Sequence, residues 1–143
     1  MQTSSENRPS KRRDAPKRGI QSTKGVFEHH LPFHRPLPFP RHVLVNDEMF
    51  PGCDVHVAVH FVTDAPAVEK HYAEPHVHDV DEINLVLGLR NEGDLVYSIR
   101  TNSEAEEVQS PRAVYIPRGR VHAAEAVRGR GIFVCIVLKG SLS

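Results

Sequence analysis

Two histidines and a carboxylate stand close together in Glu74-Pro75-His76-Val77-His78-Asp79-Val80-Asp81-Glu82, directly before the apolar run from Ile83 to Leu89. In an extended chain, residues two apart point to the same side, so His76, His78 and Glu82 can share one face. Two imidazoles and a carboxylate on one face are donors suited to a divalent metal ion, provided that a fourth group arrives from elsewhere. The spacing therefore predicts a metal site where a strand begins.

The best candidate for the fourth donor is His122, which closes the stretch Ile116-Pro117-Arg118-Gly119-Arg120-Val121-His122. A lone His-x-His pair is common by chance, and His76 and His78 alone could be two polar residues on a loop. The combination of that pair, a following glutamate and a later Pro-x-Gly-x-x-His is much less common. We therefore predict that His76, His78, Glu82 and His122 bind one divalent metal ion.

The rest of the chain after residue 43 has the pattern of short β-strands. Apolar residues alternate with other residues from Val55 to Val62, and no segment shows the 3.6-residue period of a helix. Asn91-Glu92-Gly93-Asp94 is typical of a hairpin turn. Arg128-Gly129-Arg130-Gly131 is expected to separate two further strands. Seven or eight short strands at regular spacing predict an all-β sandwich or closed barrel.

Composition narrows the class of protein. The 143 residues are enough for one domain, and 18 basic residues balance 18 acidic ones, so no nucleic-acid partner is expected. No run of 18 apolar residues is present, so no membrane association is expected either. Two cysteines do not form a disulfide framework, and a cytoplasmic location is the expectation.

The chain divides into three parts. Residues 1–24 are polar and basic, which predicts a disordered tail; a nucleic-acid-binding or partner-binding arm is the alternative. Residues 25–42 alternate prolines with large apolar residues, which excludes a helix and predicts an extended arm. The barrel domain is expected to span residues 43–143. Exposed apolar residues and unpaired strand edges are usually buried against another protein surface, so we expect a homodimer with the arm and an edge strand in the interface.

The two histidine motifs carry a family likeness. His76-x-His78-x3-Glu82 resembles the first cupin motif, and Pro117-x-Gly119-x2-His122 resembles the second. The resemblance covers roughly residues 55–138 and implies a small single-domain jelly-roll barrel that holds one metal ion. Four family positions differ: two glycines are replaced by Lys70 and Pro111, one is displaced to Gly88, and an asparagine is replaced by Ala126.

Other polar residues are candidates for the lining of a pocket. His56 and His60 share one face of their strand, so they line the pocket as proton shuttles or substrate anchors if that face is the interior, and are surface residues if it is not. Asn84 has the parity of Glu82 and is expected to touch substrate or orient a ligand. The amphipathic Tyr97 and Tyr115 are expected to line the core, and Tyr97 is also a catalytic candidate.

Three imidazoles and one carboxylate suit Fe(II) first, and also Mn, Ni, Cu, Co or Zn. In an octahedral ion such a set leaves two neighbouring positions at which a small organic substrate can chelate. We expect a dioxygenase-type oxidoreductase that uses O2. The first alternative is a redox-neutral isomerase, decarboxylase, lyase or cyclase in which the ion is a Lewis acid. The second is a non-enzymatic protein that binds a small ligand.

Overall fold

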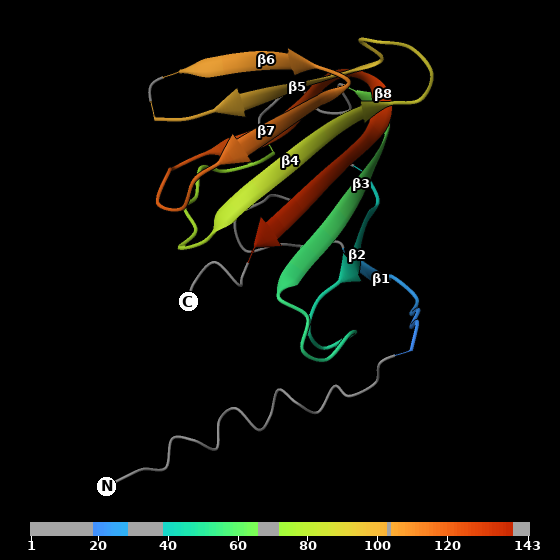
Figure 1. Cartoon of the computed structure of the whole chain (residues 1–143). Helices are drawn as coiled ribbons and strands as arrows, with labels where there is room; N and C mark the ends of the chain where they lie inside the picture. Colours follow the sequence, from blue (N-terminus) through green and yellow to red (C-terminus); the bar gives the residue numbers. More distant parts are fainter. Residues whose placement is uncertain (1–18, 29–38, 66–71, 103, 139–143) are drawn as a thin grey trace, which may run out of the picture.

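The computed structural model describes residues 19–28, 39–65, 72–102 and 104–138 (Figure 1). Most of the predicted basic tail and the middle of the predicted arm, including all residues from 29 to 38, therefore lie outside the described residues. Within the described ranges the regular elements are all strands. They are β1 (Val26–Glu28), β2 (Arg41–Val45), β3 (Val55–Ala65), β4 (Asp81–Gly88), β5 (Leu95–Arg100), β6 (Ala105–Gln109), β7 (Arg112–Ile116) and β8 (Ala123–Leu138).

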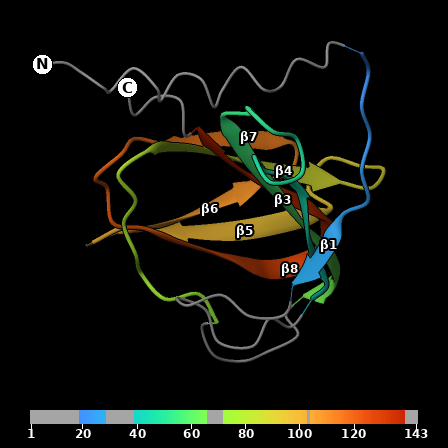
Figure 2. The same ribbon diagram turned by 90° about the horizontal axis from the view of Figure 1, so that it is seen from below.

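The strands form one antiparallel sheet that folds over on itself. Its main order is β1-β2-β3-β8-β4-β7, and β5 joins β8 on one side and β6 on the other. Figure 2 shows the β5–β6 pair across the interior from β4 and β7. The all-β class predicted from the strand pattern is confirmed, and so is the jelly-roll barrel that the cupin resemblance implies. None of the described residues forms a helix of the length and apolar character that a membrane crossing needs.

Strand β8 connects the two layers, and here one sequence expectation is wrong. The predicted turn over residues 128–131 is part of a continuous strand: residues 123–129 pair with β5, and residues 131–138 pair with both β3 and β4. The glycines let β8 bend between the layers. Gly129 has a φ of 90°, and a Cβ there would overlap the carbonyl oxygen of Asp94.

The inner face of the main layer follows from the strand register, because directly opposed residues of antiparallel strands share a face. Glu82 of β4 is opposite Val137 of β8, and Val137 is opposite His56 of β3. The same register relates Asn84 to Ala58, and Val86 to His60. The buried core lies between this face and β5 and β6, and includes Val62, Tyr72, Val86, Leu95, Tyr97, Ile99, Val108 and Phe133.

The two tyrosines expected in the core have different positions. Tyr97 is fully buried, and its ring stacks on Phe133 with ring centroids 4.1 Å apart. Tyr115 is 58% exposed on the outer face of β7, so that expectation is wrong. Tyr115 is directly opposite Ile83 rather than Glu82 or Asn84, and a one-residue difference in register reverses the face.

The described ends of the predicted arm take part in the sheet. Strand β1 pairs with β2, and β2 pairs with β3. Phe39, just before β2, is only 5% exposed and its ring meets that of Tyr72 edge to face, with centroids 6.2 Å apart. Residues on both sides of the 29–38 gap therefore pack on the barrel.

Candidate metal centre

The backbone brings the two histidine motifs together. His76 and His122 form an isolated antiparallel bridge in which each amide nitrogen donates to the other carbonyl oxygen, at 3.0 and 2.9 Å. The amide of Gly119 donates to the carbonyl oxygen of His78 at 2.9 Å. Gly119 has a φ of 81°, which a residue with a side chain rarely adopts, so the glycine permits the turn that returns the chain to His122.

The imidazole rings converge on one point. One ring nitrogen from each of His76, His78 and His122 lies within 4.8 Å of the other two. Nδ1 of His76 lies 2.9 Å from the carbonyl oxygen of Glu74, and Nδ1 of His122 lies 2.9 Å from that of Arg120. A carbonyl oxygen can only accept, so in the neutral rings Nδ1 carries the proton and Nε2 presents a lone pair.

Glu82 completes the cluster. It is the first residue of β4 whose side chain lies on the inner face. Its Oε1 lies 3.3 Å from Nε2 of His78 and 3.2 Å from Nε2 of His122. Its Oε2 accepts hydrogen bonds from Nδ2 of Asn84 at 2.8 Å and from the thiol of Cys135 at 3.3 Å. One carboxylate oxygen is thus held by the protein, and the other faces the histidines.

These contacts fit a cation. Oε1 of Glu82 and Nε2 of His122 are both buried, and neither has a hydrogen-bond partner among the described residues. A carboxylate oxygen and an imidazole lone pair repel each other unless a proton or metal ion lies between them. Bonds of about 2.1 Å place neighbouring ligands of an octahedral ion about 3.0 Å apart, close to the 3.2 and 3.3 Å found. The four residues could therefore hold one divalent ion.

The electrostatics of the cluster favour the metal-binding forms of Glu82 and His76, but not that of His122. Burial alone would raise the pKa of Glu82, but contacts with His122, His78 and Asn84 outweigh it and hold the pKa well below its usual value. Burial lowers the pKa of His76. Burial also opposes protonation of His122, but Glu82 and the Arg120 carbonyl raise its pKa overall, so a proton competes with a cation at this ring.

The other predicted residues lie on the inner face. His60 is 5% exposed and its ring packs edge to face on Phe133, with centroids 5.4 Å apart. His56 is half-buried on the same face, at the level of Glu82. The interior alternative for both histidines is therefore the one found. Asn84 is fully buried beside Glu82, whereas Tyr97 reaches the interior from the opposite layer.

Sequence reasoning missed several residues around the site. Cys135 touches Glu82, and Arg41 donates from Nε to Nε2 of His60 at 3.2 Å. Asp81 accepts the amide of Arg118 at 2.9 Å, which fixes the second motif against the first. Only the parity of Cys135 within its strand could have indicated an inward position, since these contacts join residues far apart in sequence.

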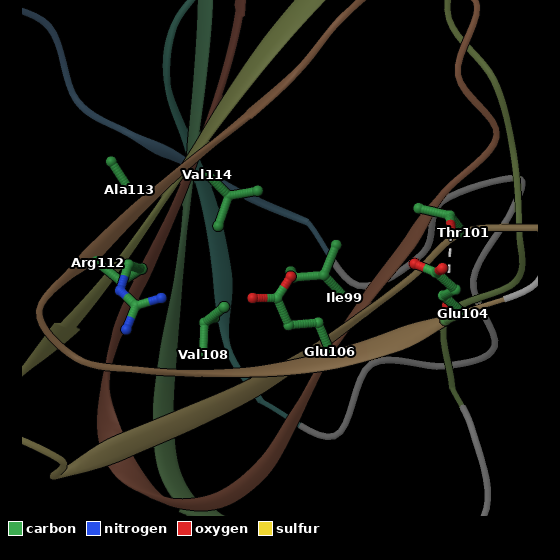
Figure 3. Close-up of a pocket in the computed structure, with 8 residues that line it drawn as sticks. All are labelled: Ile99, Thr101, Glu104, Glu106, Val108, Arg112, Ala113 and Val114. Atoms are coloured by element: carbon green, nitrogen blue, oxygen red, sulfur yellow. Dashed lines mark hydrogen bonds between the residues drawn. The ribbon is translucent and has the colours of Figure 1, made fainter.

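A cavity of about 240 Å³ lies between the β5–β6 pair and β7 (Figure 3). Val114, which is directly opposite Asn84, forms part of its wall, so the cavity borders the inner face that carries Glu82. The four converging residues do not line it. Its walls combine apolar and charged side chains: Ile99, Thr101, Glu104, Glu106, Val108, Arg112, Ala113 and Val114.

The sheet and the cluster together define a class: an all-β barrel with three histidines and a buried carboxylate gathered inside one end. No protein-family model matches the sequence, and no curated protein matches it. Solved structures do match. The chain resembles an RmlC-like cupin from Shewanella frigidimarina at 11% identity and a TM-score of 0.54, over 85% of this chain and 92% of that one.

Two enzymes share the same architecture. The polyketide cyclase RemF from Streptomyces resistomycificus matches at 18% identity and a TM-score of 0.55, over 85% of this chain and 78% of that one. Hydroxypropylphosphonic acid epoxidase from S. wedmorenis matches at 16% identity and a TM-score of 0.52, over 83% of this chain and 59% of that one. At these identities the likeness shows the fold alone. The chain has the cupin fold, and the predicted resemblance is confirmed at that level.

Proposed function

We propose that the chain is a metal-dependent enzyme that acts on a small organic substrate at a centre formed by His76, His78, Glu82 and His122. One observation carries the proposal: two buried acceptor atoms, Oε1 of Glu82 and Nε2 of His122, lie 3.2 Å apart with no hydrogen-bond partner among the described residues. Such a pair is costly in a folded protein unless a proton or a metal ion joins it, and the convergence of ring nitrogens from His76 and His78 on the same point favours the metal ion.

The donor set favours Fe(II), with Mn, Ni, Cu, Co and Zn as alternatives. When bound, the ion would supply either dioxygen activation or Lewis acidity to a chelating substrate. The chain's own residues set the geometry. Asn84 holds Oε2 of Glu82, and the Glu74 and Arg120 carbonyls fix the tautomers of His76 and His122.

We favour an O2-dependent, dioxygenase-type reaction over a redox-neutral isomerase, decarboxylase, lyase or cyclase reaction. In support, a structure that shares the fold is described as an Fe(II) form of the epoxidase, at 16% identity and a TM-score of 0.55. The cyclase RemF, also of this fold, supports the alternative. Non-enzymatic ligand binding is the third outcome. His56 and His60 lie on the inner face and are our candidates for residues that move protons or contact substrate.

The test reconstitutes metal-free protein with Fe(II) or Zn(II) and supplies a panel of small chelating acids under air and under argon. The proposal expects oxygen uptake and product with Fe(II) in air, and none with Zn(II). Turnover with Zn(II) under argon would assign the Lewis-acid chemistry instead. Metal uptake without turnover of any chelating acid would favour a ligand-binding protein.

A further inference from the structure

The carboxylate of Glu82 has a second support besides Asn84, which is the thiol of Cys135. Cys135 lies on β8, directly opposite Asn84 of β4 on one side and Ala58 of β3 on the other, so the three side chains share the inner face. Asn84 and Ala58 are fully buried. Glu82 is one inner-face position from Asn84 along β4, which makes it a diagonal neighbour of Cys135.

The thiol of Cys135 makes one hydrogen bond among the described residues. Its Sγ donates to Oε2 of Glu82 at 3.3 Å. The side chain of Ala58, its neighbour on β3, is a methyl group and offers no competing acceptor. An ionised carboxylate only accepts, so the proton of this bond belongs to the sulfur. The position of the carboxylate therefore determines where the S–H group points.

The two oxygens of Glu82 consequently have different roles. An ionised carboxylate offers about two lone-pair sites on each oxygen. Those of Oε2 accept from Nδ2 of Asn84 at 2.8 Å and from the thiol of Cys135 at 3.3 Å. Oε1 has no hydrogen-bond partner among the described residues and lies 3.3 and 3.2 Å from Nε2 of His78 and His122. Oε2 is held by the strands, and Oε1 faces the rings.

This division determines how Glu82 can bind an ion. An oxygen that uses both lone-pair sites for hydrogen bonds has none left for a metal, so Glu82 would bind through Oε1 alone. Three imidazoles and a one-atom carboxylate fill four positions of an octahedral ion and leave two for a chelating substrate. A carboxylate that bound through both oxygens would leave only one.

We infer that Cys135 is a positioning residue for this centre: its S–H group, together with Asn84, keeps Glu82 a one-atom ligand and so keeps a second position open for a chelating substrate. The inference rests on the proposed function and assigns a role to a residue outside the four converging ones. Without the thiol, Oε2 has a lone pair free to turn towards the ion. Loss of a group that holds a metal ligand typically reduces metal affinity or activity about 10- to 100-fold.

The contact itself is tested in metal-free protein by infrared spectroscopy, because the S–H stretching band lies where other protein groups do not absorb. A hydrogen bond to a carboxylate moves this band to lower frequency. The band that Cys135→Ser removes should lie below that of Cys53, whose thiol is 3.6 Å from the carbonyl oxygen of Val55. It should move to higher frequency in Glu82→Gln, because an amide oxygen is a weaker acceptor than a carboxylate.

The consequence is tested in Co(II)-loaded protein with two probes that change the visible absorption of the ion. Acetohydroxamate chelates through two atoms and needs two neighbouring positions, whereas azide needs one. Cys135→Ala should bind acetohydroxamate about tenfold more weakly than wild type, while its azide affinity changes less than about threefold. A merely structural role of Cys135 would alter the free energy of unfolding and leave the ratio of the two affinities unchanged.

The chain offers matched controls. Cys135→Ser keeps a donor at the same place, so its ratio should stay within about threefold of wild type. Cys53→Ala removes the other thiol of the chain and should keep the wild-type ratio. If Cys135→Ala does not fold, Cys135→Val is measured instead, since it fills the space without a donor and should show the same loss.

The outcomes separate the two proposals. An unchanged ratio in Cys135→Ala, an equal loss in Cys135→Ser, or an S–H band of Cys135 that does not respond to Glu82→Gln would overturn this inference and leave the metal centre standing. A wild-type protein that takes up no Co(II) would overturn the proposed function, and this inference with it.

Discussion

Replacing Glu125 with alanine should destabilise the metal-free fold by about 3 to 6 kcal/mol. Glu125 is 5% exposed, and its Oε2 accepts the amides of Tyr72 at 2.8 Å and Ala73 at 3.0 Å. Hydrogen bonds to a charged group contribute about 1.5–3 kcal/mol each, and the truncation leaves both amides buried without an acceptor. The ion pair with the partly exposed Arg100, at 3.6 Å, adds little.

The measurement is urea unfolding in the presence of a chelator, which removes any contribution of bound metal. Glu125→Gln keeps an oxygen that both amides can use, so it should cost less than half as much as Glu125→Ala. Glu107→Ala is the matched control, because Glu107 pairs with Arg128 at 3.0 Å but both side chains are more than half exposed. It should cost less than about 1 kcal/mol.

Glu125→Ala should also weaken metal binding. Tyr72 and Ala73 precede His76 by a few residues, so their attachment to Glu125 anchors the segment that carries the first motif onto β8. The reasoning is refuted if Glu125→Ala unfolds at the same urea concentration as Glu107→Ala. Equal losses for Glu125→Ala and Glu125→Gln would show that the charge, rather than the two amide hydrogen bonds, provides the stability.

Three further predictions follow from other parts of the fold. The pKa of Tyr72 is raised from 10.0 to about 12, chiefly by burial, so the ionisation of this residue should contribute a loss of roughly 3 kcal/mol in the free energy of unfolding between pH 10 and pH 12, and Tyr72→Phe should remove that contribution. Gly129→Ala should destabilise by more than about 2 kcal/mol because of the clash with Asp94, and by clearly more than Gly93→Ala, where the nearest atom is 3.6 Å away. A homodimer through residues 25–42 and an edge strand remains a prediction: light scattering should give twice 16.0 kDa, and the single-chain mass would contradict it.

The features that sequence predicted well depend on local spacing. His76, His78 and Glu82 lie within one extended stretch, so their convergence follows from strand geometry. His122 could be added because the Pro-x-Gly turn places it at a fixed distance along the chain. The alternation of apolar residues over β3 predicted a strand, but it did not show whether the face with His56 and His60 is the inner or the outer one. That choice depends on pairing with β8, which lies some 70 residues further on.

The features that sequence missed depend on contacts between distant segments. The residues flanking Gly129 have turn chemistry, yet β8 continues because β5 pairs with its first half and β3 and β4 with its second. Cys135 touches Glu82, and Glu125 binds Tyr72, each pair 53 residues apart. Arg41 lies in a segment that its prolines mark as an arm, and only the sheet register reveals that its side chain is inside.

The most direct measurement of the central claim is the metal content of purified protein after dialysis against a divalent metal and then against metal-free buffer. The account predicts about one ion per wild-type chain, little in His122→Gln and reduced content in Glu82→Gln. His42→Gln is the control, because His42 packs against Phe27 and Phe61 and should retain the wild-type content. A wild-type chain without metal, or full content in His122→Gln, would contradict the account.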